Sequence, residues 1–373
     1  MPKLAFIVTE DWFFASHFLP MARAAVSMGL DVVVIARVRA HAPAIEVTGA
    51  RVRPLEAERR SINPLAATSA VVRLARILRE EQPDIVHCIS LKPILVGGAA
   101  CVLAGLPRRV YALTGLGFLG AKTDRTGRAA RAALRRIIRG PLSSPQTHFV
   151  FENEDDPKLL GLDPCAPDVT ILGGAGIDPA AYPATPLPSG KRLRVAVVSR
   201  MLWSKGIDTA VDAVRQARER GVDVTLSLYG APDPSNPKAI PLQTLREWSA
   251  QPGITWHGPT GSVATVWNEH HAACLPSRGG EGLPRTLLES AACGRPSLTT
   301  DVPGCRTFVR NGVDGLVVPV DDVEALAGAI ARLAGDRSLV DRMGIEAAAR
   351  VRDGFTEADV AAQIQAVYRD LLR

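Results

Sequence analysis

Short apolar runs alternate with longer mixed segments along the chain. Residues 4–9 form a continuous apolar run, residues 31–36 predict a second strand, and residues 17–28 between them predict a helix. Continuous apolar runs are typical of strands buried on both faces of a parallel sheet, and their alternation with helices predicts an α/β fold. Further strands of the first half are predicted at residues 85–88, 109–113, 147–151 and 169–172.

The same pattern restarts in the second half. Residues 207–217 carry apolar positions at helical spacing, and residues 357–372 predict a closing helix. A helix over residues 284–293 has Pro284 at its first position and Gly294 just beyond its end, the usual asymmetry of helix ends. Strands of the second half are predicted at residues 193–199, 224–229, 254–257, 273–275 and 296–300.

The restart predicts two domains, and a length of 373 residues suits two domains of ordinary size. Prolines cluster between Pro179 and Pro188 and are followed by Ser189 and Gly190, a composition typical of a semi-rigid linker. We therefore expect an N-terminal domain at 1–183, a linker at 184–190, a C-terminal domain at 191–355 and a closing helix at 356–373.

Composition points to a globular cytosolic protein. Hydrophobic residues make up 47% of the chain and charged residues 22%. The six cysteines show no CxxC pair and no zinc spacing, so we expect reduced thiols. The first apolar run is too short for a signal peptide, and no run reaches the roughly 18 apolar residues of a membrane span. We expect a cytoplasmic protein, soluble or peripheral on the membrane.

One segment carries most of the positive charge. Residues 122–139 hold seven lysines and arginines against a lone Asp124, with alanine, leucine and isoleucine between them. A basic helix with an apolar stripe can lie on an anionic membrane surface, where each basic group contributes about 1 kcal/mol. A solvated surface helix is the alternative. No motif or interleaved aromatics support nucleic-acid binding.

Two cations follow the first strand of the second half. Arg200 and Lys205 lie in the loop at residues 199–206, which leads from this strand into a helix. A helix N-terminus attracts anions, and two added cations suit a departing diphosphate. Taken alone, the pattern also fits a solvent-exposed basic loop.

A second constellation pairs two carboxylates eight residues apart. Glu281 lies in a loop with Gly279, Gly280 and Gly282, where the backbone can approach a ligand closely. Glu289 lies on the second turn of the helix that follows. Carboxylates at these two places can accept hydrogen bonds from separate hydroxyls of one ligand, such as those of a sugar and a ribose. The alternative is a capping acid and a surface glutamate.

The Arg-x4-Lys-Gly loop and the segment at residues 281–291 resemble the donor site of the family 4 retaining glycosyltransferases. The resemblance implies a GT-B fold, with two Rossmann-like domains facing across a cleft and the C-terminal helix closing back on the N-terminal domain. It implies that Arg200 and Lys205 hold the donor diphosphate, that Glu289 binds the ribose and that Glu281 contacts the transferred sugar. It further implies transfer with retention, without a metal or other cofactor. The remaining implied donor contacts are Ser199, His257, Gly258, Gly282 and Leu283.

The first half departs from many relatives, because residues 10–17 form a loop without glycine after the first strand. This departure still resembles the subgroup that builds bacterial surface polysaccharides and lipid-linked oligosaccharides. No histidine occupies the position of Thr114, where relatives acting on phospholipid acceptors often carry one. The expected acceptor-side residues are His17, Ser61, His87, Lys92 and Thr114. The acidic run at residues 152–156 is interpreted as a helix start rather than a metal site.

The resemblance implies transfer of a hexose or N-acetylhexosamine from a nucleotide sugar, UDP-linked by analogy with the subgroup. The expected acceptor is a saccharide, or one linked to polyprenyl diphosphate. A sugar-nucleotide 2-epimerase and a non-catalytic sugar-nucleotide-binding protein are the alternatives. A nicotinamide dehydrogenase would need GxGxxG after the first strand, and residues 10–16 lack it.

Overall fold

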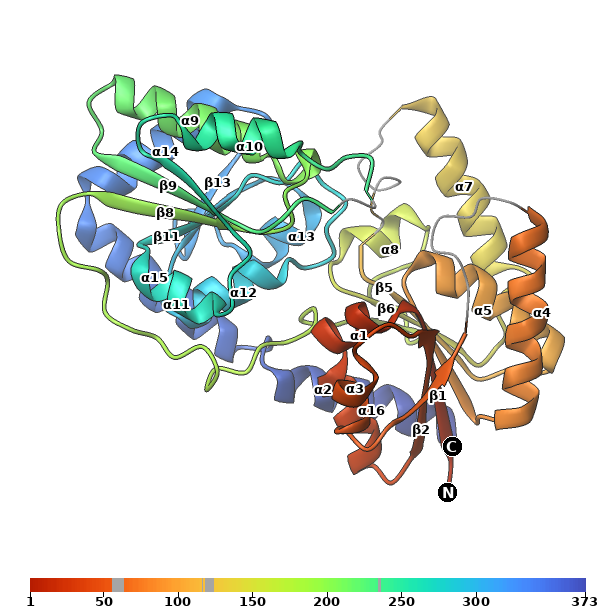
Figure 1. Cartoon of the computed structure of the whole chain (residues 1–373). Coiled ribbons are helices and arrows are strands. Elements are labelled where there is room, and N and C mark those ends of the chain that lie inside the picture. Colours follow the sequence, from red (N-terminus) through yellow and green to blue (C-terminus); the bar gives the residue numbers. More distant parts are fainter. Residues whose placement is uncertain (56–63, 116, 118–123, 234–235) are drawn as a thin grey trace. The chain divides into compact units, whose positions relative to one another are not determined.

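The computed structural model describes the chain except residues 56–63, 116, 118–123 and 234–235. The chain divides into two compact units (Figure 1). Unit 1 comprises residues 1–175 together with 357–373, and unit 2 comprises residues 176–356. In the described part of the chain, no helix is both long and apolar enough to cross a membrane.

Unit 1 is built on a seven-stranded parallel sheet in the order β3-β2-β1-β4-β5-β6-β7. The central strands are almost completely buried, which explains their continuous apolar runs. The strands are β1 (Lys3–Glu10), β2 (Asp31–Arg37), β3 (Arg51–Pro54), β4 (Ile85–Ile89), β5 (Arg109–Leu113), β6 (Thr147–Phe151) and β7 (Val169–Ile171).

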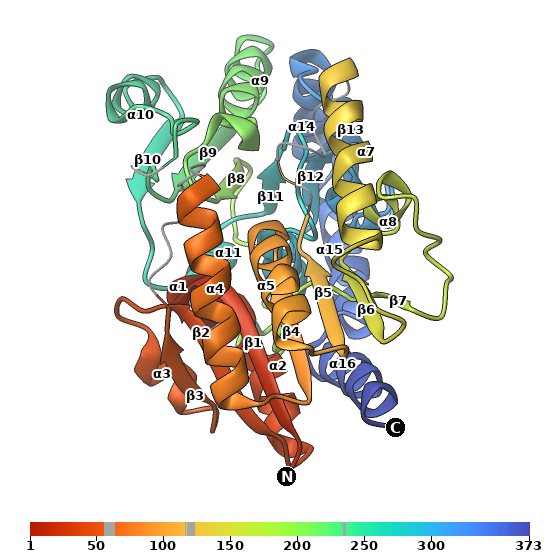
Figure 2. The same cartoon turned by 90° about the vertical axis from the view of Figure 1, so that its right-hand side faces the viewer.

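Helices cover both faces of this sheet. Helices α2 and α16 pack together on one face, and α4, α5 and α7 cover the other (Figure 2). The C-terminal helix thus joins unit 1, as predicted. The described helices of unit 1 are α1 (Asp11–His17), α2 (Leu19–Ser27), α3 (Ala42–Glu46), α4 (Pro64–Glu81), α5 (Leu91–Ala104), α7 (Arg125–Arg139), α8 (Asp155–Leu159) and α16 (Glu357–Leu372).

The segment after β1 differs from its prediction as a loop, because residues 11–17 form helix α1. The carboxylate of Asp11 is fully buried at the start of this helix. It accepts backbone hydrogen bonds from Trp12, Arg39, Ala40 and His41 at 2.7–3.1 Å. Burial opposes ionisation, yet these donors lower the pKa of Asp11. One side chain therefore fixes both α1 and the segment after β2.

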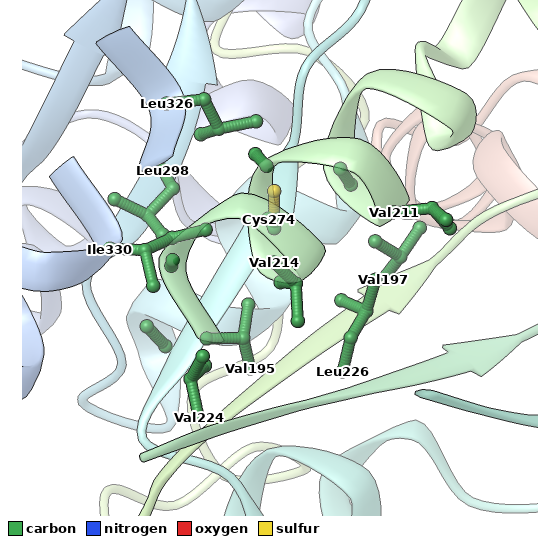
Figure 3. Close-up of a cluster of buried hydrophobic side chains, with 14 of the residues drawn as sticks. Val195, Val197, Val211, Val214, Val224, Leu226, Cys274, Leu298, Leu326 and Ile330 are labelled. Carbon is green, nitrogen blue, oxygen red and sulfur yellow. The ribbon is translucent and has the colours of Figure 1, made fainter. Parts of the chain in front are cut away.

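Unit 2 repeats the architecture with a six-stranded parallel sheet in the order β10-β9-β8-β11-β12-β13. Val195 and Val197 of β8 pack against α9, and Leu298 packs toward α14 (Figure 3). The strands are β8 (Leu193–Val198), β9 (Val224–Tyr229), β10 (Ile254–Gly258), β11 (Ala272–Leu275), β12 (Ser297–Thr300) and β13 (Gly315–Val318). The helices are the 3-10 turn η1 (Trp203–Lys205), α9 (Ile207–Glu219), α10 (Leu242–Ser249), α11 (Val263–Glu269), α12 (Arg285–Ala292), α13 (Pro303–Phe308), α14 (Val323–Gly335) and α15 (Arg337–Arg352).

The proline-rich segment belongs to unit 2, whereas its composition predicted a linker at 184–190. Arg295, which is fully buried, donates to the carbonyl oxygens of Thr185 at 2.7 Å and Pro186 at 3.1 Å. His271 contacts the carbonyl of Pro188 at 2.9 Å. These contacts tie the segment to unit 2, so the chain passes between the units at residues 175–176 and 356–357.

Candidate functional site

The candidate functional site of unit 2 lies at the carboxyl ends of β8 and β11. These strands are neighbours in the parallel sheet, so the loops that follow them emerge at the same edge. The loop after β8 carries Arg200 and Lys205, and the loop after β11 carries Ser277 and Glu281. The fold thus brings together two constellations that lie 76 residues apart, measured from Lys205 to Glu281.

Lys205 and Glu281 form a close ion pair at this edge. The Lys205 Nζ lies 2.7 Å from Glu281 Oε1, and the Ser277 hydroxyl donates to the same oxygen at 2.8 Å. The two charged side chains are 16% and 15% exposed, so the pair is largely shielded from water. Burial acts to raise the pKa of Glu281, but Lys205, Ser277 and Arg200 outweigh it and lower that pKa. Glu281 is therefore a carboxylate at neutral pH.

Arg200 lies at the exposed side of the same cluster. Its guanidinium is 3.5 Å from a carboxylate oxygen of Asp233, and its side chain is 48% exposed. An ion pair of this exposure and length is weak, and the guanidinium can exchange Asp233 for another anion at little cost. Ser199 is fixed by its backbone, whose N–H donates to the Tyr229 carbonyl at 3.0 Å.

Glu289 of α12 is buried and accepts hydrogen bonds from two polar side chains. Arg285, one turn earlier on α12, donates to its Oε1 at 3.0 Å, and the Tyr182 hydroxyl donates to the same oxygen at 3.2 Å. Glu289 is only 8% exposed, and burial raises its pKa even though Arg285 and Tyr182 oppose the shift. Sequence reasoning did not identify Tyr182, which lies 107 residues before Glu289.

Arg278 holds the loop of Lys205 in place, a role that no sequence motif indicated. Its guanidinium contacts both carboxylate oxygens of Asp208 at 2.8 Å and one oxygen of Asp321 at 2.6 Å. Its backbone N–H donates to the Ser204 carbonyl at 2.9 Å. Bidentate arginine–carboxylate contacts are directional as well as strong. Arg278 therefore sets the position of the turn that presents Lys205.

A glycine permits the two loops to approach each other. Gly206 follows Lys205 with a φ of +66°, and a Cβ at this position would lie 1.9 Å from the Pro276 carbonyl oxygen. No side chain can be accommodated at that distance. The backbone of Gly206 therefore allows the turn of Lys205 to lie against the loop after β11.

The predicted base-binding position contains a stacked aromatic pair. His257 stacks on Tyr229 with ring centroids 4.6 Å apart and an angle of 7° between the planes. Gly258, with a φ of +75°, accepts a hydrogen bond from the backbone of Gly230 at 2.8 Å. Gly282 and Leu283 connect Glu281 to α12, and Leu283 is buried among apolar side chains. Tyr229 was not identified from the sequence.

The predicted acceptor-side residues of unit 1 lie in different environments. His17 ends α1, where its Nδ1 lies 2.7 Å from the Ser16 hydroxyl. Lys92 lies in the first turn of α5, and Thr114 follows β5 with its hydroxyl 3.1 Å from that of Ser90. These three residues lie at the carboxyl ends of strands β1, β4 and β5 or in the elements that follow them. Ser61 lies outside the described residues.

His87 does not lie on the acceptor side, contrary to its prediction. It lies in the middle of β4 and is fully buried, so it cannot contact an acceptor. Its Nδ1 is 2.7 Å from the hydroxyl of Tyr368 in α16, and burial lowers its pKa to about 3. His87 is therefore a neutral core residue that joins the sheet to the C-terminal helix.

Residues 125–139 of the basic segment form helix α7, and the lone acid of the segment has a structural role. Asp124 caps the helix by accepting from the backbone N–H of Gly127 at 2.7 Å. Leu134 and Ile138 face the core, while the arginines lie on the outer side. A hollow beside the helix is lined by Arg128, Arg131, Arg135, Arg136, Arg139 and Leu159 among others.

Two family models match this chain. The model described as "Glycosyl transferases group 1" matches residues 192–336, and the model described as "Glycosyl transferase 4-like" matches residues 3–142. The chain thus contains two glycosyltransferase domains, a 4-like domain followed by a group 1 domain. The group 1 match contains the cluster of Arg200, Lys205, Ser277 and Glu281 and also Glu289.

Curated relatives cover the chain to different extents. An N,N'-diacetylbacillosaminyl-diphospho-undecaprenol alpha-1,3-N-acetylgalactosaminyltransferase of Campylobacter jejuni is 24% identical over 87% of this chain and 87% of its own length. A UDP-Gal:alpha-D-GlcNAc-diphosphoundecaprenol alpha-1,3-galactosyltransferase of Escherichia coli is 22% identical over 84% and 82%. An exopolysaccharide phosphotransferase of Streptomyces coelicolor is 32% identical over 47% of this chain, which spans 19% of that protein.

Solved structures establish the fold. Anabaena HepE in complex with UDP-glucose superposes with a TM-score of 0.79 at 17% identity, covering 99% of this chain and 100% of that one. The sucrose-phosphate synthase of Thermosynechococcus elongatus gives a TM-score of 0.79 at 19% identity, covering 100% and 99%. The two parallel-sheet units thus have the GT-B fold that the sequence predicted.

Proposed function

We propose that this chain is a retaining glycosyltransferase that moves a hexose or N-acetylhexosamine from a UDP-linked donor. Its acceptor is a saccharide, free or linked to polyprenyl diphosphate, in the assembly of a surface polysaccharide or lipid-linked oligosaccharide. The observation that carries the proposal is the cluster of Lys205, Glu281 and Ser277 beside Arg200. The names of the Campylobacter and Escherichia relatives support the substrate class.

The cluster offers positive and negative groups to different parts of a nucleotide sugar. Arg200 and Lys205 bind the diphosphate, and Glu281 accepts hydrogen bonds from hydroxyls of the transferred sugar. Glu289 binds the ribose, and the stack of Tyr229 and His257 lies beside the base. Ionised Glu281 cannot donate a proton, which assigns it to binding rather than acid catalysis.

The reaction is a front-face substitution at the anomeric carbon. The bond from this carbon to the β-phosphate oxygen breaks as the acceptor oxygen attacks from the same face. The leaving phosphate takes the acceptor proton, and Arg200 and Lys205 stabilise the negative charge that develops on the diphosphate. Two cations at this position supply the stabilisation that a metal would otherwise give, so we propose a metal-independent reaction without other cofactors.

The test is donor binding and slow donor hydrolysis across UDP-, GDP- and ADP-sugars, with Glu281→Ala as the paired variant. We expect one nucleotide sugar to bind saturably and to release its sugar, with release lost in Glu281→Ala and unchanged by EDTA. If no nucleotide sugar binds at millimolar concentration, the proposal is wrong. Binding without release, even with saccharide acceptors, would indicate a non-catalytic binding protein instead. The relatives named above are transferases and give no support to an epimerase.

The basic helix α7 provides a membrane contact in this proposal, on the inner face of the cytoplasmic membrane. Arg128 and Arg136 are exposed, as is the apolar Ile137. The test is cosedimentation with vesicles of phosphatidylglycerol against vesicles of phosphatidylcholine. We expect binding to the anionic vesicles alone, weakened by Arg128→Gln with Arg136→Gln and by high salt. Sedimentation with neither kind of vesicle would indicate a solvated surface helix, and equal sedimentation with both would show that the arginines do not drive binding.

A further inference from the structure

The Lys205–Glu281 pair places a buried negative charge next to the position proposed for the donor diphosphate. The Glu281 Oε1 lies 2.7 Å from the Lys205 Nζ. The Glu281 side chain is 15% exposed, so water screens its charge poorly. An anion that approaches Lys205 therefore meets the Glu281 carboxylate as well. The two compete for the ammonium group of Lys205.

This competition differs between a nucleotide sugar and a free nucleoside diphosphate. The β-phosphate of an intact nucleotide sugar is a diester and carries one negative charge. The terminal phosphate of a nucleoside diphosphate carries nearly one charge more at neutral pH. Glu281 therefore repels the free diphosphate more strongly. The free diphosphate also lacks the sugar hydroxyls that could donate hydrogen bonds to Glu281 in place of Lys205 and Ser277.

We propose that Glu281 is a specificity-determining residue that makes the site favour the intact nucleotide sugar over the nucleoside diphosphate product. The charge of Glu281 weakens product binding, while sugar hydroxyls compensate the carboxylate when the donor is bound. Lys205 changes partner from Glu281 to the diphosphate when either ligand binds. Product release is thereby favoured once the sugar has left. This inference rests on the proposed donor site.

The matched variant is Glu281→Gln, which removes the charge with almost no change in shape. Calorimetry measures the dissociation constants of UDP, GDP and ADP, then of the glucose or mannose nucleotide with the base that binds. We expect Glu281→Gln to bind the free diphosphate about tenfold more tightly than the unchanged protein. The preference for the nucleotide sugar should fall by at least the same factor, because the amide also makes a weaker contact with the sugar.

Ser277→Ala is the control variant, since it removes a neutral donor to the same Glu281 oxygen and leaves the charge in place. It should not tighten binding of the free diphosphate. Thermal unfolding checks that both variants fold.

The possible results separate the two proposals. If Glu281→Gln binds the free diphosphate equally or more weakly, or gains equally for both ligands, the inference is overturned while the donor site stands. If the unchanged protein binds no nucleotide or nucleotide sugar, the proposed function fails and the inference fails with it.

Discussion

His87 and Tyr368 form a buried hydrogen bond of 2.7 Å between residues that lie 281 positions apart in the chain. Both side chains are fully buried, and the two rings meet edge to face with centroids 5.9 Å apart. The contact joins β4, in the middle of the unit 1 sheet, to α16. A polar pair of this kind in an apolar core fixes the register in which the helix packs on the sheet.

Tyr368→Phe should destabilise unit 1 by about 1–2 kcal/mol, because it leaves the His87 Nδ1 without its partner inside the core. Hydrogen exchange of the α16 amides measures the effect. Arg369→Lys, at an exposed position of the same helix, should change stability by less than about 0.5 kcal/mol. Equal protection in the two variants would contradict a stabilising role for the pair.

Unit 1 should lose stability as the pH falls below the ordinary histidine pKa. His87 has its pKa lowered from 6.5 to about 3, so between these values the unfolded chain takes up a proton that the folded chain does not. The stabilisation is complete above pH 6.5 and is lost progressively down to pH 3. The loss between pH 7 and pH 5 is about 2 kcal/mol for this group.

The measurement is the free energy of opening of unit 1, from hydrogen exchange at pH 7 and pH 5. In His87→Asn the pH-dependent loss should be smaller by about 2 kcal/mol, even though the variant is less stable at pH 7. Carboxylates contribute equally in both proteins, so the difference isolates His87. An identical loss in the variant would show that His87 already binds its proton in the folded state.

Arg295→Lys should destabilise unit 2 by roughly 3 kcal/mol or more. A lysine has three donors and no planar fork, so several carbonyl groups that Arg295 now contacts would be left buried without a donor. These acceptors are the carbonyls of Trp267, His270, Thr185, Cys293, Gly294 and Pro186.

Tryptophan fluorescence during urea unfolding measures this change, because four of the five tryptophans lie in unit 2. Arg192→Lys is the control, since Arg192 pairs with Asp223 at an exposed site. Its effect should stay within about 1 kcal/mol. Similar losses in both variants would show that burial of Arg295 carries no special stabilisation.

Gly206→Ala should disrupt the loop at residues 199–206, whereas Gly221→Ala should be tolerated. Both glycines have a positive φ, +66° and +85°, so both substitutions carry the same backbone cost. Only at Gly206 would the added Cβ collide with a backbone oxygen, while at Gly221 no atom lies within 4 Å. We expect an extra loss of roughly 2 kcal/mol at Gly206 and loss of nucleotide binding. Comparable effects at the two sites would contradict the close approach of the loops.

Arg278→Lys should raise the KM for the donor about tenfold while kcat changes less than about threefold. Lysine cannot form the bidentate contact with both oxygens of Asp208, so the turn that presents Lys205 loses its fixed position. Steady-state kinetics at varied donor concentration separate the two parameters. A fall in kcat at unchanged KM would assign Arg278 a different role from positioning Lys205.

The sequence was sufficient for the elements whose signal is local. The central strands are continuous apolar runs, and predictions such as residues 109–113 and 224–229 match β5 and β9. The strand β3 was missed because its sequence, RVRP, alternates charge with apolar residues at the edge of the sheet. Helix α1 was missed because its seven residues are too few to show helical spacing.

The sequence predicted only those residues of the candidate site that belong to a recognisable local motif. Lys205 and Glu281 stood out by their loop context, and the structure brings them into contact. Arg278 and Tyr182 acquire their roles through partners distant in the sequence, which no local pattern reveals. His87 was misassigned for the same reason, since the sequence alone does not show that this polar residue of β4 pairs with Tyr368 inside the core.

The assignment of α16 to unit 1 determines the order in which the two units can complete their cores during synthesis. Val360, Ile364, Val367 and Tyr368 complete the apolar face of a sheet whose strands lie before residue 175. All of unit 2 leaves the ribosome before this helix does. The unit that is synthesised first is therefore the last to close its core, and this apolar face stays uncovered while the intervening 181 residues are translated.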